Sequence, residues 1–212
     1  DGDEVPRDEF SVYPFAYAVA VIVVNDSNPI DEISVARLGG IFGSKEESNL
    51  NTWGELGLSG MGSRNIKALA GTYDESIALE LFKYSILKGG VMKPSVSMVK
   101  DGEVEDLLRS DAASIAILSH MPENKNIKVL MVSSDSDTYA PAFGPTDDNV
   151  HYGDYPIRLA FYIVYNLRDD AKLRPTIREL LNDEVATSLR LNDLIALPDT
   201  LRRKFLIDLD LE

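Results

Sequence analysis

The sequence predicts an α/β fold, in which buried strands alternate with amphipathic helices. Residues 17–25 (YAVAVIVVN) are dense in Val and Ala, which is typical of a strand that is buried on both faces. Residues 73–87 place apolar side chains at helical spacing, and Gly89-Gly90 follows as a stop signal. Strands that alternate with helices in this way favour mostly parallel pairing.

The remaining elements are predicted in chain order. Residues 1–14 form a polar, acidic tail, and residues 33–42 form a helix with Ser34 as its N-cap. The helix over 73–87 starts with a capping box between Thr72 and Glu75. The other expected strands are 66–70, 114–118, 127–132 and 159–166. The other expected helices are 104–109, 175–181, 183–191 and 199–205. Residues 133–153 are expected to form a long loop.

Composition excludes several classes of protein. The 212 residues include no Cys, which removes disulfides, thiolate nucleophiles and Cys-ligated zinc sites. No G-x-S-x-G, Walker A or G-x-G-x-x-G motif occurs, and His120 and His151 lie in separate predicted loops without metal-ligand spacing. We therefore expect no enzyme activity, no cofactor and no metal site.

Charge is unevenly distributed along the chain. The net charge is −14, which argues against nucleic acid as a partner because tight binding to a phosphate backbone needs a basic surface. Residues 61–100 are the exception, with six basic and three acidic side chains. A solvated helix face explains such a stretch as well as a binding site does.

The segment Ala70-Gly71-Thr72 leads into the predicted helix at Tyr73, inside the basic stretch. A helix N-terminus offers unpaired N–H groups and partial positive charge to an oxyanion. Arg64 and Lys67 lie just upstream as candidate cations. In the alternative interpretation, Thr72 only caps its own helix and Gly71 relieves a turn, with no ligand.

Four stretches resemble, in the expected order, the periplasmic phosphate-binding proteins of ABC transporters, the PstS-like group of type 2 periplasmic binding proteins. They are VAVIVVNDSNPI, ISVARLGGIFGSKEESNLNTWGELG, SRNIKALAGTYDESIALELF and YPIRLAFYIVYN. The resemblance implies a periplasmic-binding-protein-like α/β fold. In that family an oxyanion is held between two lobes by Arg, Ser, Thr and backbone N–H groups.

The resemblance also assigns ligand-binding positions. The family's Arg falls on Arg64, its Gly on Gly71 and its Thr on Thr72, and the predicted site runs on to Tyr73. The family Ser falls on Ala70, which has no hydroxyl. The spacing from Arg64 to Gly71 is about two residues longer than usual, so Lys67 is the alternative cation. Each missing charge-assisted hydrogen bond typically costs about 1.5–3 kcal/mol.

The family's opening Gly-Ser-(Ser/Thr)-Thr loop and its first two strand–helix units have no counterpart in this sequence. We therefore expect one nearly complete lobe over 20–155, and a reduced lobe built from a tail and crossover (1–19) and from 156–212. Half of the cleft is absent or is supplied from outside this sequence. The elements from Leu159 onward would then expose a sheet edge or apolar face, which predicts a partner: a second copy in a homodimer, or a missing segment.

Two functions follow from these observations. The first is capture of phosphate or a similar oxyanion in the periplasm or outside the cell, for delivery to the membrane component of an ABC transporter. The second is a binding-protein fold that has lost its ligand and acts in protein–protein interaction or assembly. Ala70 and the missing lobe favour the second, whereas the local positive charge and the Gly-Thr pair favour the first.

Overall fold

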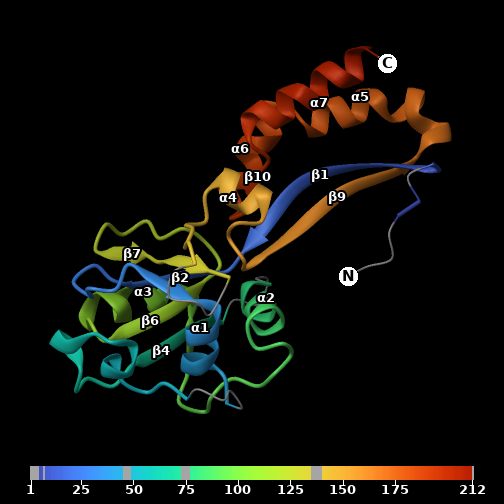
Figure 1. Ribbon diagram of the computed structural model, residues 1–212. Coiled ribbons are helices and arrows are strands. Elements are labelled where there is room, and N and C mark those ends of the chain that lie inside the picture. Colours follow the sequence, from blue (N-terminus) through green and yellow to red (C-terminus); the bar gives the residue numbers. More distant parts are fainter. Residues whose placement is uncertain (1–4, 7, 45–48, 73–76, 135–139, 212) are drawn as a thin grey trace. The chain divides into compact units, whose positions relative to one another are not determined.

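The computed structural model describes residues 5–6, 8–44, 49–72, 77–134 and 140–211 (Figure 1). The chain forms two compact units. Unit 1 consists of Asp1–Ala18 and Leu159–Glu212, and unit 2 is the continuous segment Val19–Arg158. The sequence prediction places the corresponding boundaries at 19/20 and 155/156.

Unit 2 is built on a five-stranded mixed sheet with the order β5-β4-β6-β2-β7. Its strands are β2 (Val21–Asn25), β4 (Lys67–Thr72), β5 (Ser97–Lys100), β6 (Ser114–Leu118) and β7 (Ile127–Val129). Strand β4 is parallel to β5 and β6, but β2 is antiparallel to both β6 and β7. The prediction of mostly parallel pairing is wrong for β2, because this strand enters the sheet where Val21 faces Leu118, at the carboxyl end of β6.

The other elements of unit 2 surround this sheet. A small parallel sheet pairs β3 (Glu32–Ser34) with β8 (Met131–Ser133). The helices are α1 (Val35–Phe42), α2 (Ala78–Ser85), α3 (Asp101–Ser110) and α4 (Asp147–Tyr152), with the short turns η1 (Trp53–Leu56) and η2 (Ser59–Met61). The N-cap prediction is confirmed at Ser34, whose Oγ accepts the N–H of Arg37 at 3.3 Å.

The core of unit 2 lies against β2 and β6, which are buried along their whole length. The rings of Phe42 and Phe82 meet edge to face at 5.1 Å between α1 and α2. Tyr155 is fully buried and donates its hydroxyl to the carbonyl of Ala20 at 2.7 Å, and burial raises the pKa of this phenol. Apolar packing with internally satisfied polar groups therefore holds the sheet.

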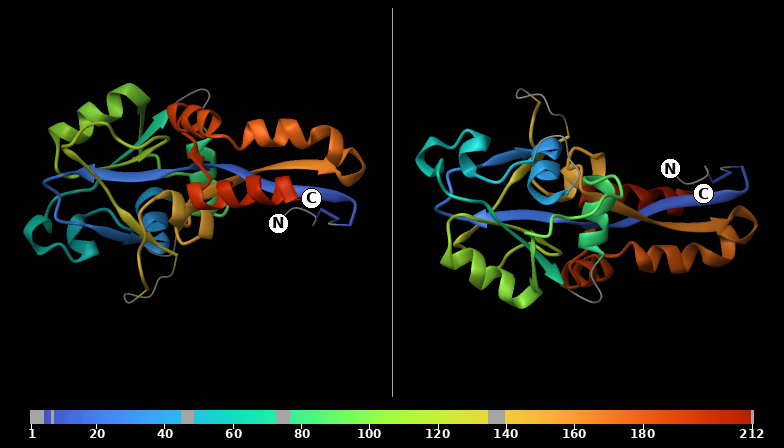
Figure 2. Two further views of the ribbon diagram at one scale, coloured as in Figure 1. Left: turned by 90° about the horizontal axis from the view of Figure 1, so that it is seen from above. Right: turned by 90° about the horizontal axis from the view of Figure 1, so that it is seen from below.

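Unit 1 contains a three-stranded sheet with the order β10-β1-β9. The strands are β1 (Phe10–Val19), β9 (Arg158–Asn166) and β10 (Ile195–Ala196). The helices are η3 (Leu167–Asp169), α5 (Asp170–Leu180), α6 (Asp183–Leu191) and α7 (Asp199–Leu211). Figures 1 and 2 show α5 and α7 along one face of the long β1 and β9 strands.

Aromatic and polar contacts fix these helices on the sheet. Tyr13 of β1 stacks on Tyr165 of β9 at 6.2 Å and meets Phe205 of α7 edge to face at 5.5 Å. The Tyr165 hydroxyl donates to Asp170 at 2.6 Å, and Arg174 donates to the same carboxylate at 2.5 Å. One face of β1 and β9 is therefore covered by α5 and α7.

Several predicted elements differ from the structure. The strand predicted over 127–132 is two strands, β7 and β8, which belong to different sheets. The strand predicted over 17–25 is two strands, because the chain passes from β1 to β2 at Ala20, whose N–H donates to the carbonyl of Ile157 at 3.1 Å. Strand β1 begins at Phe10, inside the predicted tail. The predicted loop over 133–153 contains α4, which Thr146 caps by accepting the N–H of Asn149 at 3.2 Å.

Candidate functional site

Strand β4 separates the predicted ligand-binding residues into two groups. Arg64 and Lys67 lie at its amino end, and Gly71 and Thr72 lie at its carboxyl end. At about 3.3 Å per residue, the Cα atoms of Lys67 and Thr72 are roughly 16 Å apart. The structure therefore does not bring Arg64 and Lys67 together with Gly71 and Thr72.

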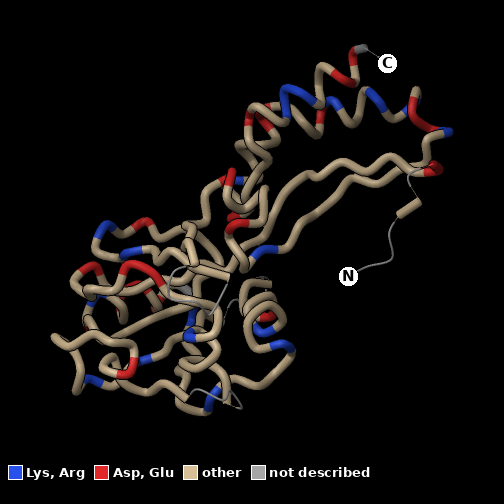
Figure 3. Tube along the Cα trace, viewed as in Figure 1, with Lys and Arg blue, Asp and Glu red and all other residues tan. Residues whose placement is uncertain are grey.

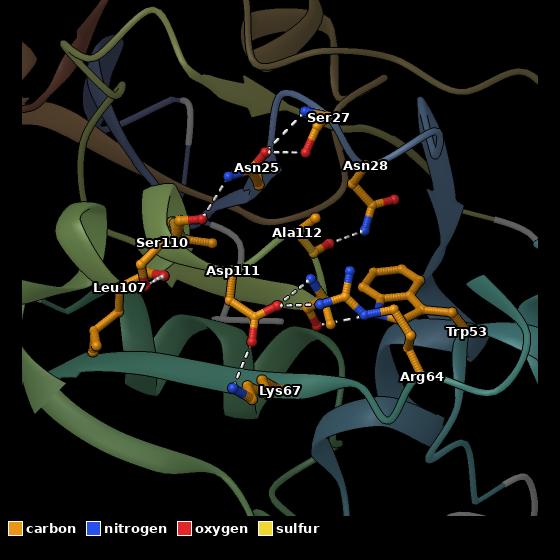
Figure 4. A network of polar contacts seen from close by, with 12 residues as sticks. Asn25, Ser27, Asn28, Trp53, Arg64, Lys67, Leu107, Ser110, Asp111 and Ala112 are labelled. Carbon is orange, nitrogen blue, oxygen red and sulfur yellow. Dashed lines mark hydrogen bonds and ion pairs between the residues drawn. The ribbon is translucent and has the colours of Figure 1, made fainter. Parts of the chain in front are cut away.

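Both upstream cations bind one carboxylate instead. Arg64 donates to Oδ1 of Asp111 at 2.7 Å, and Lys67 reaches Oδ2 at 2.5 Å (Figure 4). Asp111 also accepts the N–H of Ala113 at 2.9 Å. The ammonium of Lys67, followed by this N–H, holds the pKa of Asp111 below its usual range. Since Asp111 holds both cations at the amino end of β4, neither lies at the Gly71–Thr72 end of the strand.

The network around Asp111 fixes the turn between α3 and β6. Asn28 donates to the carbonyl of Ala112 at 2.9 Å, and the indole of Trp53 donates to the carbonyl of Ala113 at 3.0 Å. Asn25 donates to carbonyls in the last turn of α3 (Figure 4). These bonds satisfy carbonyl groups that a helix end and a turn leave without partners. This network is structural.

At the other end of the strand, Ala70 and Gly71 are parts of a sheet rather than of a loop. Ala70 is fully buried, and its register partners are Met98 on β5 and Ile117 on β6. Gly71 is opposite Val99. The side chain at position 70 therefore lies in the core of unit 2.

Thr72 does not stand at the start of a helix, as the predicted cap requires. Thr72 is the last residue of β4, and the described part of α2 begins at Ala78, after Ile77, which makes no side-chain capping bond. Tyr73 and Glu75, which the predicted site and capping box require, lie outside the described residues.

Lys100 is a basic residue at this edge of the sheet that the sequence analysis did not assign to the site. It is the register partner of Thr72 across the parallel β4–β5 pair. Its side chain is exposed and forms no ion pair with any described residue. Lys100 also precedes α3 without a side-chain capping bond, so the first N–H groups of α3 lie at the same edge of the sheet. Only strand pairing reveals this proximity, because residues 73–99 separate the two positions.

The carboxyl end of β6 adds further polar groups to this edge. The strand ends at Leu118, and Ser119 Oγ lies 3.3 Å from Nδ1 of His120. The other ring nitrogen of His120 lies 3.6 Å from the Glu105 carboxylate. Ligands of open α/β sheets bind at the carboxyl ends of parallel strands. We call Gly71, Thr72, Lys100, Ser119 and His120 the carboxyl-edge site.

Two other kinds of site have no support in the described part of the chain. It holds no group of three or more His, Asp or Glu side chains placed to bind a metal ion. None of its helices has both the length and the apolar character needed to cross a membrane. The second histidine, His151, contacts the ring of Tyr152 at 4.9 Å on α4.

Comparison with known proteins gives likeness in structure alone. No protein-family model matches the chain, and no curated protein matches it in sequence. A possible phosphate-binding protein from Planctomyces limnophilus superposes with a TM-score of 0.71 at 17% identity, over 95% of this chain and 72% of that one. PstS from Borrelia burgdorferi superposes with a TM-score of 0.70 at 15% sequence identity, over 92% of this chain and 77% of that one. An ABC-type phosphate transport receptor from Vibrio cholerae superposes with a TM-score of 0.63 at 17% sequence identity, over 93% of this chain and 76% of that one.

These likenesses define the class of fold. The chain has the α/β fold of a periplasmic binding protein, with one nearly complete unit and one reduced unit. More particularly, its fold is PstS-like, and the chain spans about 72–77% of the length of the three structures. The expected fold class is confirmed. The Planctomyces limnophilus and Vibrio cholerae neighbours are described as a possible phosphate-binding protein and a phosphate transport receptor.

Proposed function

We propose that this protein binds phosphate or a similar oxyanion outside the cytoplasm and delivers it to the membrane component of an ABC transporter. The fold supports this proposal, since the neighbouring structures are described as phosphate-binding or phosphate-transport proteins. No covalent step is required, and no nucleic acid is involved. Binding would rest on charge and hydrogen-bond donors alone.

One observation carries the proposal: Lys100 faces Thr72 at the carboxyl edge of the sheet. A lysine ammonium is a compact donor that suits a phosphate oxygen. In this proposal Gly71 permits close approach of the anion, the Thr72 hydroxyl donates, and Lys100 supplies the charge. The N–H groups at the start of α3 add partial positive charge. Glu105 opposes the anion, and its carboxylate lies 3.6 Å from a ring nitrogen of His120.

Calorimetric titration of the phosphate-stripped protein with phosphate, with sulfate as the control anion, tests the proposal. Lys100→Met and Thr72→Val should each weaken binding roughly tenfold or more, because each removes a donor to a charged group. Arg64→Gln is the matched control, because Arg64 binds Asp111 at the other end of β4. It should leave the affinity unchanged. Equal weakening by Arg64→Gln and Lys100→Met would place the anion elsewhere and contradict the carboxyl-edge site.

A second function is favoured by a different observation. Both cations that the family resemblance selects pair with Asp111, and Ala70 is buried in the sheet. A binding-protein fold that has lost its ligand and serves in protein–protein interaction would have these features. The same titration separates the two functions. Absence of heat up to millimolar phosphate would favour the interaction module and reject oxyanion transport.

A further inference from the structure

His120 stands at the carboxyl edge of the unit 2 sheet, beside the residues to which the proposed function assigns the anion. The parallel register of β4 and β6, continued beyond the end of β6, places Ser119 beside Thr72. Lys100 is the partner of Thr72 on the other side. His120 is the residue after Ser119 and therefore directly follows a strand end that borders the proposed anion position.

Both ring nitrogens of His120 face a polar group. Nδ1 lies 3.3 Å from Oγ of Ser119, and Nε2 lies 3.6 Å from Oε1 of Glu105 on α3. The side chains of His120 and Glu105 are 25% and 22% exposed, so water screens their interaction only in part. The ring is thus held between a hydroxyl and a carboxylate.

Glu105 is the charged group that dominates the surroundings of His120. No charged residue lies on β2 or β6 (Figure 3). The other described charged residues on the elements packed against β6, and on the segment after it, are paired or exposed. The paired ones are Lys67 with Asp111, Glu80 with Lys83, and Asp106 with Arg109. The exposed ones are Glu103, Glu123 and Lys125.

Protonation of His120 changes both contacts of the ring. In the neutral ring, the carboxylate of Glu105 favours a proton on Nε2, so Nδ1 accepts the hydroxyl proton of Ser119. In the charged ring both nitrogens donate, and Nδ1–H donates to Oγ of Ser119. The Ser119 hydroxyl then turns its own proton to another acceptor, and the imidazolium balances the charge of Glu105. Both changes favour an anion at this edge of the sheet.

We propose that His120 is a second cation of the carboxyl-edge site, and that its protonation increases the affinity of the site for an oxyanion. This inference rests on the proposed function. Lys100 supplies one charge of the site, and His120 adds another in its protonated form. Histidine changes its charge between about pH 5 and pH 8, so capture of the anion strengthens as the surroundings acidify through this range.

Calorimetric titration with phosphate near pH 6 and near pH 8 tests the inference in the unaltered chain and in His120→Gln. The ratio of the two affinities at one pH is compared, because it cancels the protonation of phosphate itself. The unaltered chain should bind roughly fivefold more tightly than His120→Gln near pH 6, and this ratio should fall towards one near pH 8. His151→Gln is the matched control, because His151 lies on α4 against Tyr152. It should behave like the unaltered chain.

Glu105→Gln tests the other half of the pair. It should strengthen phosphate binding near pH 8 by roughly fivefold, because it removes the carboxylate that opposes the anion when His120 is neutral. Asp106→Asn is the matched control on the next residue of α3, since the Asp106 side chain is 71% exposed and pairs with Arg109. It should leave the affinity unchanged, and an equal gain in both variants would contradict the role of Glu105.

A second measurement uses the unaltered chain. Since the chain has two histidines, the Gln variants assign the ring signals of each in the NMR spectrum. Phosphate added near pH 7 should increase the protonated share of His120 but not of His151, because coupling between proton and anion is reciprocal. Equal affinity ratios near pH 6 and pH 8, or a His120 ring that bound phosphate does not affect, would overturn the inference but not the transport function. Absence of phosphate binding at both pH values would reject the transport function, and the inference with it.

Discussion

Arg64, in the loop before β4, donates at 2.7 Å to the carboxylate of Asp111, the C-cap residue of α3. This ion pair decides how the basic stretch over residues 61–100 is interpreted. With Lys67 on the same carboxylate, two of its six basic side chains stabilise the turn before β6 rather than attract a ligand. The charge available to an anion at the carboxyl-edge site comes from Lys100.

Asp111→Asn should lower the free energy of unfolding by about 1 kcal/mol at pH 7. The figure is small because the two partner cations are about half exposed, and solvent screens such pairs. The pKa of Asp111 is lowered in the folded protein, so its contribution is complete above the unfolded pKa of about 4 and is lost as pH falls through the folded pKa. Urea unfolding at several pH values measures this. Equal stability of the two proteins at pH 7 would contradict it.

Lys93→Met should destabilise unit 2 more strongly. Lys93 is 8% exposed and donates to the carbonyls of Gly40 at 2.5 Å and Leu50 at 2.9 Å. Its removal takes a charged donor from both carbonyls, of which Gly40 keeps the N–H of Leu50, at a cost of about 2–3 kcal/mol. Lys88→Met is the control, because Lys88 also donates to a carbonyl but is exposed. Thermal unfolding of both variants checks the difference, and a similar shift in both would refute it.

Tyr165→Phe should lower stability by about 1–2 kcal/mol through the loss of one partly buried hydrogen bond to Asp170. The Tyr165 hydroxyl is the largest cause of the lowered pKa of Asp170, ahead of Arg174. The lowered pKa means that this stability is present above about pH 4 and disappears on acidification through the folded pKa. Chemical unfolding compares the variant with Tyr162→Phe, whose ring is exposed and whose stability should not change.

Ala70→Ser tests the serine position that the family resemblance suggests. Ala70 is fully buried, so the new hydroxyl would lie in the core and should leave phosphate affinity unchanged. A buried hydroxyl without a partner should also cost about 1–2 kcal/mol of stability. Calorimetry and thermal unfolding measure the two effects together. Tighter phosphate binding would mean that position 70 reaches the ligand after all.

Local signals predict several elements correctly. Strand β6 has the predicted bounds, since five buried residues form a short run from Ser114 to Leu118. Helix α6 also has the predicted bounds, and the Asn182 side chain caps it by accepting the N–H of Val185 at 2.8 Å. These signals lie within a few residues of the element itself. Sequence reasoning is therefore sufficient for them.

Long-range pairing accounts for the elements and site residues that were missed. Gly71 is a poor strand former, yet β4 continues through it because β5 pairs with it. Pro14 suggests an irregular tail, but β1 accommodates it where β10 pairs only with Ala16 and Tyr17. Neither the Asp111 ion pairs nor the neighbourhood of Thr72 and Lys100 can be derived from spacing, because the partners lie far apart in the chain.

Unit 1 is made of two segments that the ribosome synthesises at different times. Strand β1 emerges before the whole of unit 2, and its neighbour β9 emerges only afterwards. During translation β1 therefore remains an apolar segment without its partner strand. Unit 2 is one continuous segment and is complete before β9 is synthesised. Chains that expose unpaired strands during synthesis are prone to aggregation. Synthesis from the N-terminus thus favours folding of unit 2 before unit 1. Until then, the nascent β1 segment is available for chaperones to bind.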